Sequence, residues 1–192
     1  NYICVADDPA RGMEGHLHLQ TLMNDNQPTD FKVDIDPEDL AGIYFTGGTT
    51  GKPKGVMLPH RAWVYTILIE MLEFDFSREE VFAYMTPLTH AGGCLMLPVL
   101  LRNGRCVIMD HFDPEEFLKT VEREKVTTTF LVPTMIYVLL DHPDLKNYNL
   151  ESLTNIIYGA SAIAPERLKQ ALTTFGPIFT QLFGQTEAPM AF

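Results

Sequence analysis

Residues 44–56 read Tyr-Phe-Thr-Gly-Gly-Thr-Thr-Gly-Lys-Pro-Lys-Gly-Val and stand between apolar runs at 41–45 and 55–58. Within 46–54 there are three glycines, three threonines and two lysines. Glycines let the backbone take positive φ and bring N–H groups close to an anion. Threonine hydroxyls and lysine ammonium groups add donors and positive charge. A solvated hairpin turn needs only one or two such residues, so the stretch predicts a phosphate-binding loop.

This loop differs from the Walker-type phosphate loop. That signature has four residues between its glycines and a Ser or Thr after its Lys, at the start of a helix. Gly47 and Gly51 are separated by three residues, and Pro53 follows the loop's first lysine and favours an extended chain there. The apolar run 106–109 and Asp110 are still compatible with a strand that ends on a magnesium ligand. A Walker-type nucleotide hydrolase is therefore the second hypothesis.

Four segments resemble the AMP-forming adenylating enzymes, which include acyl-CoA synthetases, luciferases and nonribosomal adenylation domains. Residues 46–56 are similar to the family's phosphate loop. Residues 87–93, Pro-Leu-Thr-His-Ala-Gly-Gly, are similar to its Pro-x-x-His segment beside the acyl pocket. Residues 158–161, Tyr-Gly-Ala-Ser, resemble its adenine-side loop, and 181–187, Gln-Leu-Phe-Gly-Gln-Thr-Glu, its aromatic-Gly-x-Thr-Glu signature. The resemblance begins near Leu40 and continues to the last residue.

The resemblance implies an ATP site built from these four segments. His90 would lie between the carboxylate substrate and the α-phosphate, Thr186 would bond the α-phosphate, and Glu187 would be the magnesium ligand. Magnesium between a carboxylate and a triphosphate turns their repulsion into attraction. The expected catalytic residues are Lys54, His90, Thr186 and Glu187. The expected nucleotide-binding residues are Thr46, Gly47, Gly48, Thr49, Thr50, Lys54, Gly159, Ala160, Ser161, Gln181, Phe183, Gly184 and Thr186.

The candidate acyl pocket is apolar in sequence. Residues 94–97, Cys-Leu-Met-Leu, follow the His90 segment, and Tyr158 is expected to line the same cavity. Such a pocket suits an aliphatic or aromatic acyl chain. An amino-acid substrate would want a buried acid for its ammonium group, and these segments offer none.

Three positions depart from the family's pattern. Gly47 stands where Ser is usual, so one hydroxyl donor to phosphate is lost. Phe183 replaces the usual Tyr, and Leu182 stands where Gly is common and is expected to narrow the neighbouring space. These departures leave a third hypothesis open, a non-catalytic nucleotide-binding module.

Composition restricts the partners. The chain has 192 residues, a length that fits one domain, and 14 basic against 25 acidic residues give a formal charge of −11. This balance argues against nucleic-acid binding through a broad basic face. No apolar run is long enough for a membrane span, and no signal peptide is visible. Cys94 and Cys106 lie in apolar runs and are expected to be buried, reduced thiols of a cytoplasmic protein.

Strand-like and helix-like patterns alternate from Leu40 onward. This alternation predicts a layered α/β fold with a mainly parallel sheet flanked by helices, part of a large N-terminal domain of the adenylating type. Residues 1–39 are expected to be an irregular lead-in, and 40–192 a partial ATP- and acyl-binding domain. The predicted strands are 41–45, 55–58, 81–86, 105–109, 127–132, 155–158 and 178–182, and the predicted helices are 60–73, 90–101, 113–124, 133–141 and 165–175.

The segments of the candidate site follow predicted strands. Ligands of open α/β sheets bind where the carboxyl ends of the strands lie, so the segments are expected to surround one ligand. The resemblance implies activation of a carboxylic acid, fatty or aryl, by magnesium-bound ATP to acyl-AMP, followed by transfer to coenzyme A. The chain begins with Asn1 rather than Met and is under half the usual family length. We therefore expect a fragment that lacks its C-terminal small domain and is inactive alone.

Overall fold

The structure is a computed structural model, and it describes residues 3–4, 17–26, 32–47, 51 and 53–190. The chain divides into two units, Asn1–Ile35 and Asp36–Phe192. In the first unit, β1 (Ile3–Cys4) and β2 (Leu17–His18) pair in parallel, and α1 (Leu19–Asp25) follows. Regular structure therefore occurs where the sequence predicted only an irregular lead-in.

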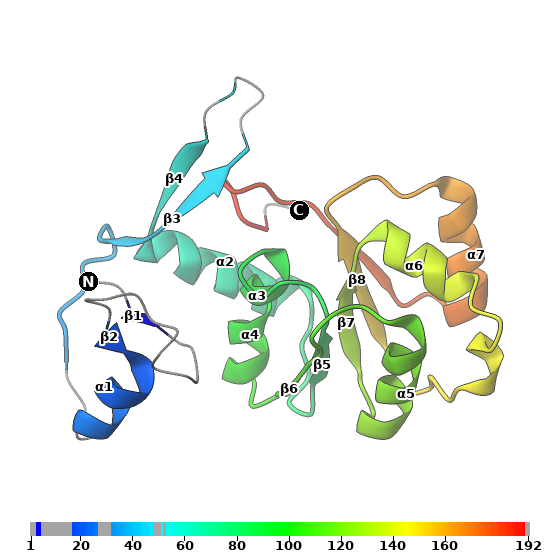
Figure 1. The fold of residues 1–192 in the computed structure, drawn as a ribbon. Coiled ribbons are helices and arrows are strands. Elements are labelled where there is room, and N and C mark those ends of the chain that lie inside the picture. Colours follow the sequence, from blue (N-terminus) through cyan, green and yellow to red (C-terminus); the bar gives the residue numbers. More distant parts are fainter. Residues whose placement is uncertain (1–2, 5–16, 27–31, 48–50, 52, 191–192) are drawn as a thin grey trace. The chain divides into compact units, whose positions relative to one another are not determined.

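A five-stranded parallel sheet forms the centre of the second unit (Figure 1). Its strand order is β6-β5-β7-β8-β9, and each consecutive pair of these strands along the chain is connected through a helix. The predicted α/β fold with a mainly parallel sheet flanked by helices is confirmed. The strands are β5 (Val81–Tyr84), β6 (Arg105–Ile108), β7 (Thr128–Leu131), β8 (Asn155–Gly159) and β9 (Phe179–Leu182).

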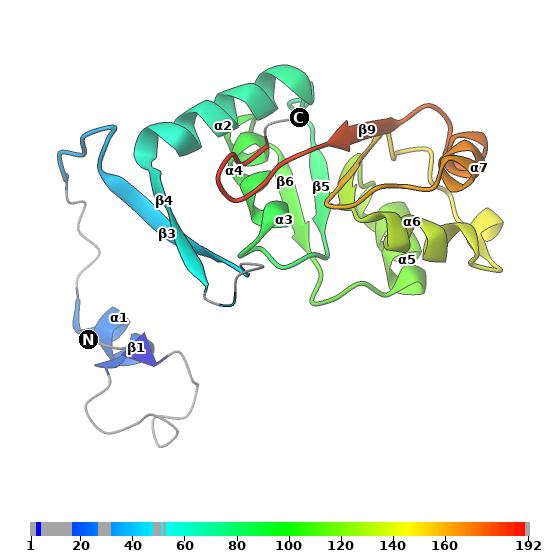
Figure 2. The same ribbon diagram turned by 90° about the horizontal axis from the view of Figure 1, so that it is seen from above.

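The two faces of this sheet bury separate hydrophobic cores, because successive side chains of a strand point to opposite faces. Phe82 and Ile157 belong to the core that also contains Leu95 and Val99, from the connection between β5 and β6. Ala83 and the neighbours of Ile157 along β8 belong to the other core, which is packed by the helices after β6, β7 and β8. Figure 2 shows these two groups of helices on either side of the strands. Both faces are covered, so the strands read as apolar runs.

Four of the five predicted helices of this unit form as single helices. They are α2 (His60–Glu73), α5 (Pro114–Glu124), α6 (Pro133–Leu140) and α7 (Pro165–Phe175). The start of α5 is capped as its sequence indicates, because the Asp113 carboxylate accepts a hydrogen bond from the Glu116 N–H at 2.8 Å. The helix predicted over 90–101 was wrong in its continuity, since it divides at Leu95 into α3 (Ala91–Cys94) and α4 (Met96–Leu101).

The glycine-rich loop connects two strands of an antiparallel hairpin, β3 (Leu40–Thr46) and β4 (Lys54–Pro59). The hairpin leads directly into α2. The ring of Tyr44 in β3 packs against the ring of Trp63 in α2, with 5.6 Å between the ring centroids. A Walker-type loop requires a strand before it and a helix immediately after it. The strand–loop–strand arrangement contradicts that hypothesis.

Helix α2 buries one acid. Glu70 is completely buried, and neither of its carboxylate oxygens has a hydrogen-bond partner among the described residues. Desolvation by burial raises the pKa of Glu70 to about 8. Burial raises the pKa of Tyr84 and of Cys94, and the nearby Glu70 carboxylate, when charged, raises both pKa values further. Glu70 is therefore a neutral acid in the folded protein at neutral pH.

The Glu70 proton makes stability depend on pH. Because the folded form holds the proton up to about pH 8 and the unfolded chain releases it near 4.5, stability falls as pH rises between these values. The expected loss is at most ~1.4 kcal/mol per pH unit. The Glu70→Gln substitution is expected to remove this dependence of stability on pH. Urea denaturation across the same pH range measures it, with Glu73→Gln, an exposed change one turn away, as the control. A slope that is the same in all three proteins would contradict the assignment.

Candidate active site

The parallel sheet collects three of the candidate segments at one edge. Because all five strands run in the same direction, the residues after β5, β8 and β9 leave the sheet from its carboxyl edge. Strand β6 lies on one side of β5, and β7 lies on the other. The connection that leaves β5 therefore runs toward one side of the sheet, and the later connections run toward the other side. Ligands of open α/β sheets bind at such a switch point. The His90 segment follows β5, while 159–161 and 183–187 complete the edge two and three strands away.

His90 stands at the start of α3 with its side chain exposed. Its backbone N–H donates to Pro87 O at 3.1 Å, and its carbonyl accepts from Gly93 N at 2.9 Å. The side chain makes no capping hydrogen bond to the helix. His90 is thus neither a core histidine nor a helix cap, and its imidazole is available to a ligand at the carboxyl edge.

The turn that holds His90 requires glycine. A Cβ atom at Gly93 would collide with the carbonyl oxygen of Leu88 and would lie 2.8 Å from its carbonyl carbon. At Gly92 a Cβ would collide with the Thr86 hydroxyl. Backbone groups from before and after His90 therefore touch, and this contact fixes the direction in which the segment leaves the sheet.

The loop after β8 is strained at a single residue. Ala160 has φ of 68°, in the left-handed region that residues with a Cβ rarely adopt. Before it, Gly159 lies so close to Leu182 of β9 that a Cβ would collide with the Leu182 carbonyl oxygen. Strain of this kind persists where the surrounding structure holds it, and it is frequent at ligand sites. The contact sets Ala160 and Ser161 beside the segment that follows β9.

Thr186 and Glu187 occupy the centre of a tight turn. The N–H of Gln185 donates to Ala188 O at 3.2 Å, and the N–H of Ala188 donates back to Gln185 O at 3.0 Å. Gly184 permits the turn, because a Cβ there would lie 2.8 Å from the Met190 nitrogen. The Glu187 side chain is exposed and Thr186 is half-buried. This turn presents one hydroxyl and one carboxylate side by side at the carboxyl edge.

The neighbours of this turn divide between core and surface. Phe183 is 58% exposed and presents a free ring at the edge. Leu182 is buried in the core on the α2 side of the sheet. Gln181 is exposed, and its Oε1 accepts a hydrogen bond from the Tyr158 hydroxyl at 3.2 Å.

The described part of the phosphate loop shows only its base. Thr46 and Lys54 are paired across the hairpin, and the Thr46 hydroxyl donates to Lys54 O at 3.4 Å. Gly51 has φ of 94°, which suits glycine alone. Gly47 is described as the last residue before the loop, and a Cβ there would meet no described atom within 4 Å. The candidate residues Gly48, Thr49 and Thr50 lie outside the described residues.

Two expectations about side chains were wrong. Tyr158 belongs to the core on the α5–α7 face, whereas Cys94, Leu95 and Met96 belong to the opposite face, so they do not line one cavity. The physical reason is the alternation of side chains along β8. Cys94 and Cys106 are free thiols, as expected, but they are half-buried rather than buried.

The side chains at the carboxyl edge are compatible with the way in which proteins usually bind magnesium. Magnesium is commonly held by one or two carboxylates, several waters and substrate phosphates. Glu187 supplies one exposed carboxylate, and among the described residues no group of three or more acid, histidine or cysteine side chains is arranged to hold a metal. Any magnesium at Glu187 would take most of its ligands from ATP and water.

Residues 3–192 match the protein family described as AMP-binding enzyme. The chain belongs to this family. It is 44% identical over 158 residues to a medium/long-chain-fatty-acid–CoA ligase, FadD8, of Mycobacterium tuberculosis, covering 82% of this chain and 28% of that protein. It is 35% identical over 166 residues to a feruloyl-CoA synthase of an Amycolatopsis species, covering 85% and 33%. The chain thus spans about a third of the length of these AMP-binding relatives.

Solved structures of other proteins share the fold. The amide bond synthetase McbA of Marinactinospora thermotolerans has a TM-score of 0.76 at 30% identity, covering 84% of this chain and 32% of that one. ATP-bound MatB of Rhodopseudomonas palustris has a TM-score of 0.82 at 24% identity, covering 92% and 37%. None of the helices in the described ranges is both long and apolar enough to cross a membrane.

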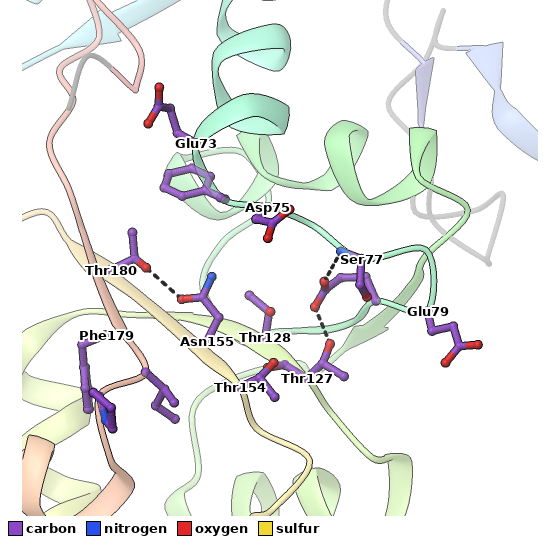
Figure 3. A pocket seen from close by; sticks show the side chains of 14 residues that line it. Glu73, Asp75, Ser77, Glu79, Thr127, Thr128, Thr154, Asn155, Phe179 and Thr180 are labelled. Carbon is purple, nitrogen blue, oxygen red and sulfur yellow. Dashed lines mark hydrogen bonds between the residues drawn. The ribbon is translucent and has the colours of Figure 1, made fainter.

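A polar cluster that the sequence did not indicate lies at the opposite edge of the sheet. Thr128, Asn155 and Thr180 lie at or near the amino ends of β7, β8 and β9 and line a cavity (Figure 3). The available signal was the Thr-Thr-Thr run at 127–129, which is polar at the start of a strand that is apolar afterwards.

The Gly93 turn can be tested by its stability. Gly93→Ala is expected to destabilise the protein by ~1–3 kcal/mol, because the new methyl group can fit only if backbone moves. Gly47→Ala is the control, since it adds the same methyl group where no described atom lies within 4 Å. Urea denaturation gives both values, and an equal effect of the two changes would refute the tight turn.

Proposed function

We propose that this chain carries the ATP and acyl sites of an enzyme that activates a fatty or aryl acid to acyl-AMP and then to acyl-CoA. One observation carries the proposal. The parallel sheet brings His90, the small-residue loop at Ala160 and the Thr186–Glu187 turn to a single edge, with the His90 segment at the topological switch point. These are the segments by which the sequence resembles adenylating enzymes, and the family membership agrees with them.

The first chemical step is an in-line displacement. A carboxylate oxygen of the acid attacks the α-phosphorus of ATP, the bond from that phosphorus to the bridging oxygen breaks, and pyrophosphate leaves. His90 orients the acid beside the α-phosphate, and Thr186 donates a hydrogen bond to an α-phosphate oxygen. Donors fixed before the reaction favour a transition state with developing charge, because they need no rearrangement. Holding both reactants together also makes the step effectively unimolecular.

The other phosphates belong to the hairpin loop in this proposal. Thr46 and Lys54 stand at its base, and Gly47, Gly48, Thr49 and Thr50 supply N–H and hydroxyl donors to the β and γ phosphates. Lys54 is exposed, so its ammonium group is free to meet an anion. Magnesium at Glu187 would neutralise charge on the departing pyrophosphate.

The adenine side uses the carboxyl ends of β8 and β9. The flat base would lie against the backbone of Gly159, Ala160 and Ser161, where small residues let it approach closely. The ring of Phe183, which is exposed, would stack on it, with Gln181 and Gly184 as neighbouring contacts. Phe183 has no hydroxyl, so it contributes stacking alone.

The second step transfers the acyl group to a thiol. The sulfur of coenzyme A attacks the acyl carbon, and AMP leaves with the former carboxylate oxygen. A fatty or aryl acid is favoured by relatives named as a fatty-acid–CoA ligase and a feruloyl-CoA synthase. McbA, named as an amide bond synthetase, makes an amine the alternative acceptor to test.

The complete reaction needs more than these residues. We propose that residues 40–192 form part of the ATP- and acyl-binding domain, and that a small C-terminal domain accounts for part of the length that the relatives have in addition. The 192-residue chain alone is expected to release no pyrophosphate with ATP, magnesium and a panel of fatty and aryl acids. Robust turnover by the chain alone would contradict this division.

The roles of His90 and Glu187 are tested in the intact protein. His90→Ala and Glu187→Gln are each expected to slow acid-dependent pyrophosphate release about 100-fold, as loss of one transition-state contact does elsewhere. Glu151→Gln removes an exposed carboxylate elsewhere on the surface and serves as the control. If the intact protein binds ATP but forms no adenylate with any acid, it is a non-catalytic nucleotide-binding module instead.

Gly47→Ser tests the phosphate loop. Ser restores the hydroxyl that the family usually has, at a position where a Cβ meets no described atom. A hydrogen bond to a charged group is worth roughly 1.5–3 kcal/mol, so the KM for ATP should fall about tenfold. Gly47→Ala adds a Cβ without the hydroxyl and should leave the KM unchanged. An equal effect of Ser and Ala would exclude a hydroxyl contact with phosphate.

A further inference from the structure

Helix α2 buries an acid that no described group satisfies. Glu70 has no exposed surface, and neither of its carboxylate oxygens has a hydrogen-bond partner among the residues that the structure describes. The other buried acid of the described chain, Glu80, accepts hydrogen bonds from Ser77 N and from the Thr127 hydroxyl. A buried polar group without a partner costs free energy, and it calls for a ligand or an ordered water.

Glu70 lies where two segments of the candidate active site meet α2. Cys94 is one turn after His90, and its thiol donates a weak hydrogen bond to His90 O at 3.9 Å. Burial, and after it the charge of Glu70 when ionised, raises the pKa of Cys94 to about 11, so these two side chains are near each other. On the same face of α2, one turn before Glu70, the Thr66 hydroxyl donates to Pro189 O at 3.5 Å. Figure 2 shows the segment after β9 passing beside α2.

The core beneath α2 is otherwise apolar or bonded internally. It is formed by aromatic and aliphatic side chains, among them Phe82, Leu95 and Met190. The Tyr84 hydroxyl in this core donates to Leu95 O at 3.1 Å, so its proton is already used. Desolvation raises the pKa of Glu70 to about 8, so the carboxyl group keeps its proton at neutral pH. Glu70 is therefore a neutral acid whose donor and acceptor are both unused among the described residues.

A hydroxyl group matches a neutral acid better than a cation does. The hydroxyl oxygen accepts a hydrogen bond from the Glu70 O–H, and the hydroxyl proton is donated to the Glu70 carbonyl oxygen. An ammonium group has donors alone, so it requires an ionised Glu70 and an ion pair removed from water. A metal ion needs several ligands, and no group of three acid, histidine or cysteine side chains is arranged to hold one in the described part of the chain.

The proposed acid substrate can bring such a hydroxyl group to Glu70. In the proposed function its carboxylate lies beside His90, and Cys94 contacts His90 and lies near Glu70. Cys94 is only half-buried, so the route inward begins at a partly open side chain. Beyond it the interior is closely packed, and a chain of methylene groups parts packed side chains more readily than an aromatic ring does. The geometry therefore favours a straight-chain acid.

We propose that Glu70 recognises a hydroxyl group at the end of a straight-chain acid remote from its carboxylate, so that the enzyme prefers ω-hydroxy fatty acids. This inference rests on the proposed function, because it takes the carboxylate of the acid to lie beside His90. The methylene chain extends from His90 past Cys94, between α2 and the sheet, and the hydroxyl group exchanges two hydrogen bonds with Glu70. Glu70 determines specificity, and no step of the adenylation passes through it.

Calorimetric titration of the intact protein without ATP tests the preference. Straight-chain acids from octanoic to hexadecanoic acid are each compared with their ω-hydroxy and ω-amino derivatives. At the length that reaches Glu70, the ω-hydroxy acid is expected to bind about tenfold more tightly than the unsubstituted acid, because it satisfies a buried group that a methyl group leaves unpaired. Equal binding of these two acids at every length, as expected if an ordered water alone satisfies Glu70, overturns the proposal. Tightest binding of the ω-amino acid overturns it as well.

Two substitutions at Glu70 distinguish its hydrogen bonds from its charge. Glu70→Gln keeps a donor and an acceptor, so it should keep the preference for the hydroxyl group. Glu70→Leu leaves a buried hydroxyl group without a partner, so the preference should reverse in favour of the unsubstituted acid. Glu73→Gln, which changes an exposed acid one turn away, is the control and should keep the preference. Loss of the preference in Glu70→Gln, or its survival in Glu70→Leu, refutes the site.

Pyrophosphate release with the same acids separates this inference from the proposed function. Release with unsubstituted acids, together with no preference for the hydroxyl group, overturns the inference alone. A preference in the titration without any acid-dependent pyrophosphate release supports the hydroxyl site at Glu70 and contradicts the proposed function.

Discussion

At the junction of β8 and β9, Gly159 lies so close to the Leu182 carbonyl that no other residue fits without movement of the backbone. The same two residues are partners in the parallel register of the sheet. This contact determines where both strands end, and hence where the next residues leave the sheet. Ala160, in its left-handed conformation, and the Thr186–Glu187 turn depend on it, because each follows directly from one of the two strands.

A parallel sheet has two unlike edges, and this protein uses them differently. The carboxyl edge carries the exposed polar side chains of His90 and Glu187 on short, glycine-dependent turns, together with the exposed ring of Phe183. The amino edge carries an acidic cavity that Thr128 and Asn155 help to line. The core between them is apolar on both faces, so the two edges are separated by packed side chains.

In helix α2, the apolar residues of the sequence do not indicate which side chains are buried. Its buried residues are Thr66 and Glu70, whereas Leu68 and Leu72 are exposed in the described structure. The Thr66 hydroxyl donates to Pro189 O at 3.5 Å, which attaches the segment after Glu187 to this helix. Glu70 has no such partner and remains buried as a neutral acid. An apolar-looking helix thus contributes polar groups to the interior.

From residue 40 onward, sequence alone predicted the order and type of the strands and helices apart from the division of 90–101, and it singled out the segments that we propose carry the chemistry. Alternating apolar runs and helix caps such as Asp113 are local signals in the sequence. The short glycine-rich segments near His90 and Gly184 can also be recognised from neighbouring residues alone. The family resemblance of the four segments agrees with the match of residues 3–192 to the AMP-binding family.

Only the tertiary structure decided which faces those residues occupy. Tyr158 lies on the face opposite Cys94 because side chains alternate along β8. The division of 90–101 into α3 and α4 at Leu95 was likewise visible only in the structure. The cavity at Thr128 and Asn155 could not be inferred, since it depends on the register of β7 with β8. Register and burial arise from contacts between residues far apart in the chain, which no local pattern contains.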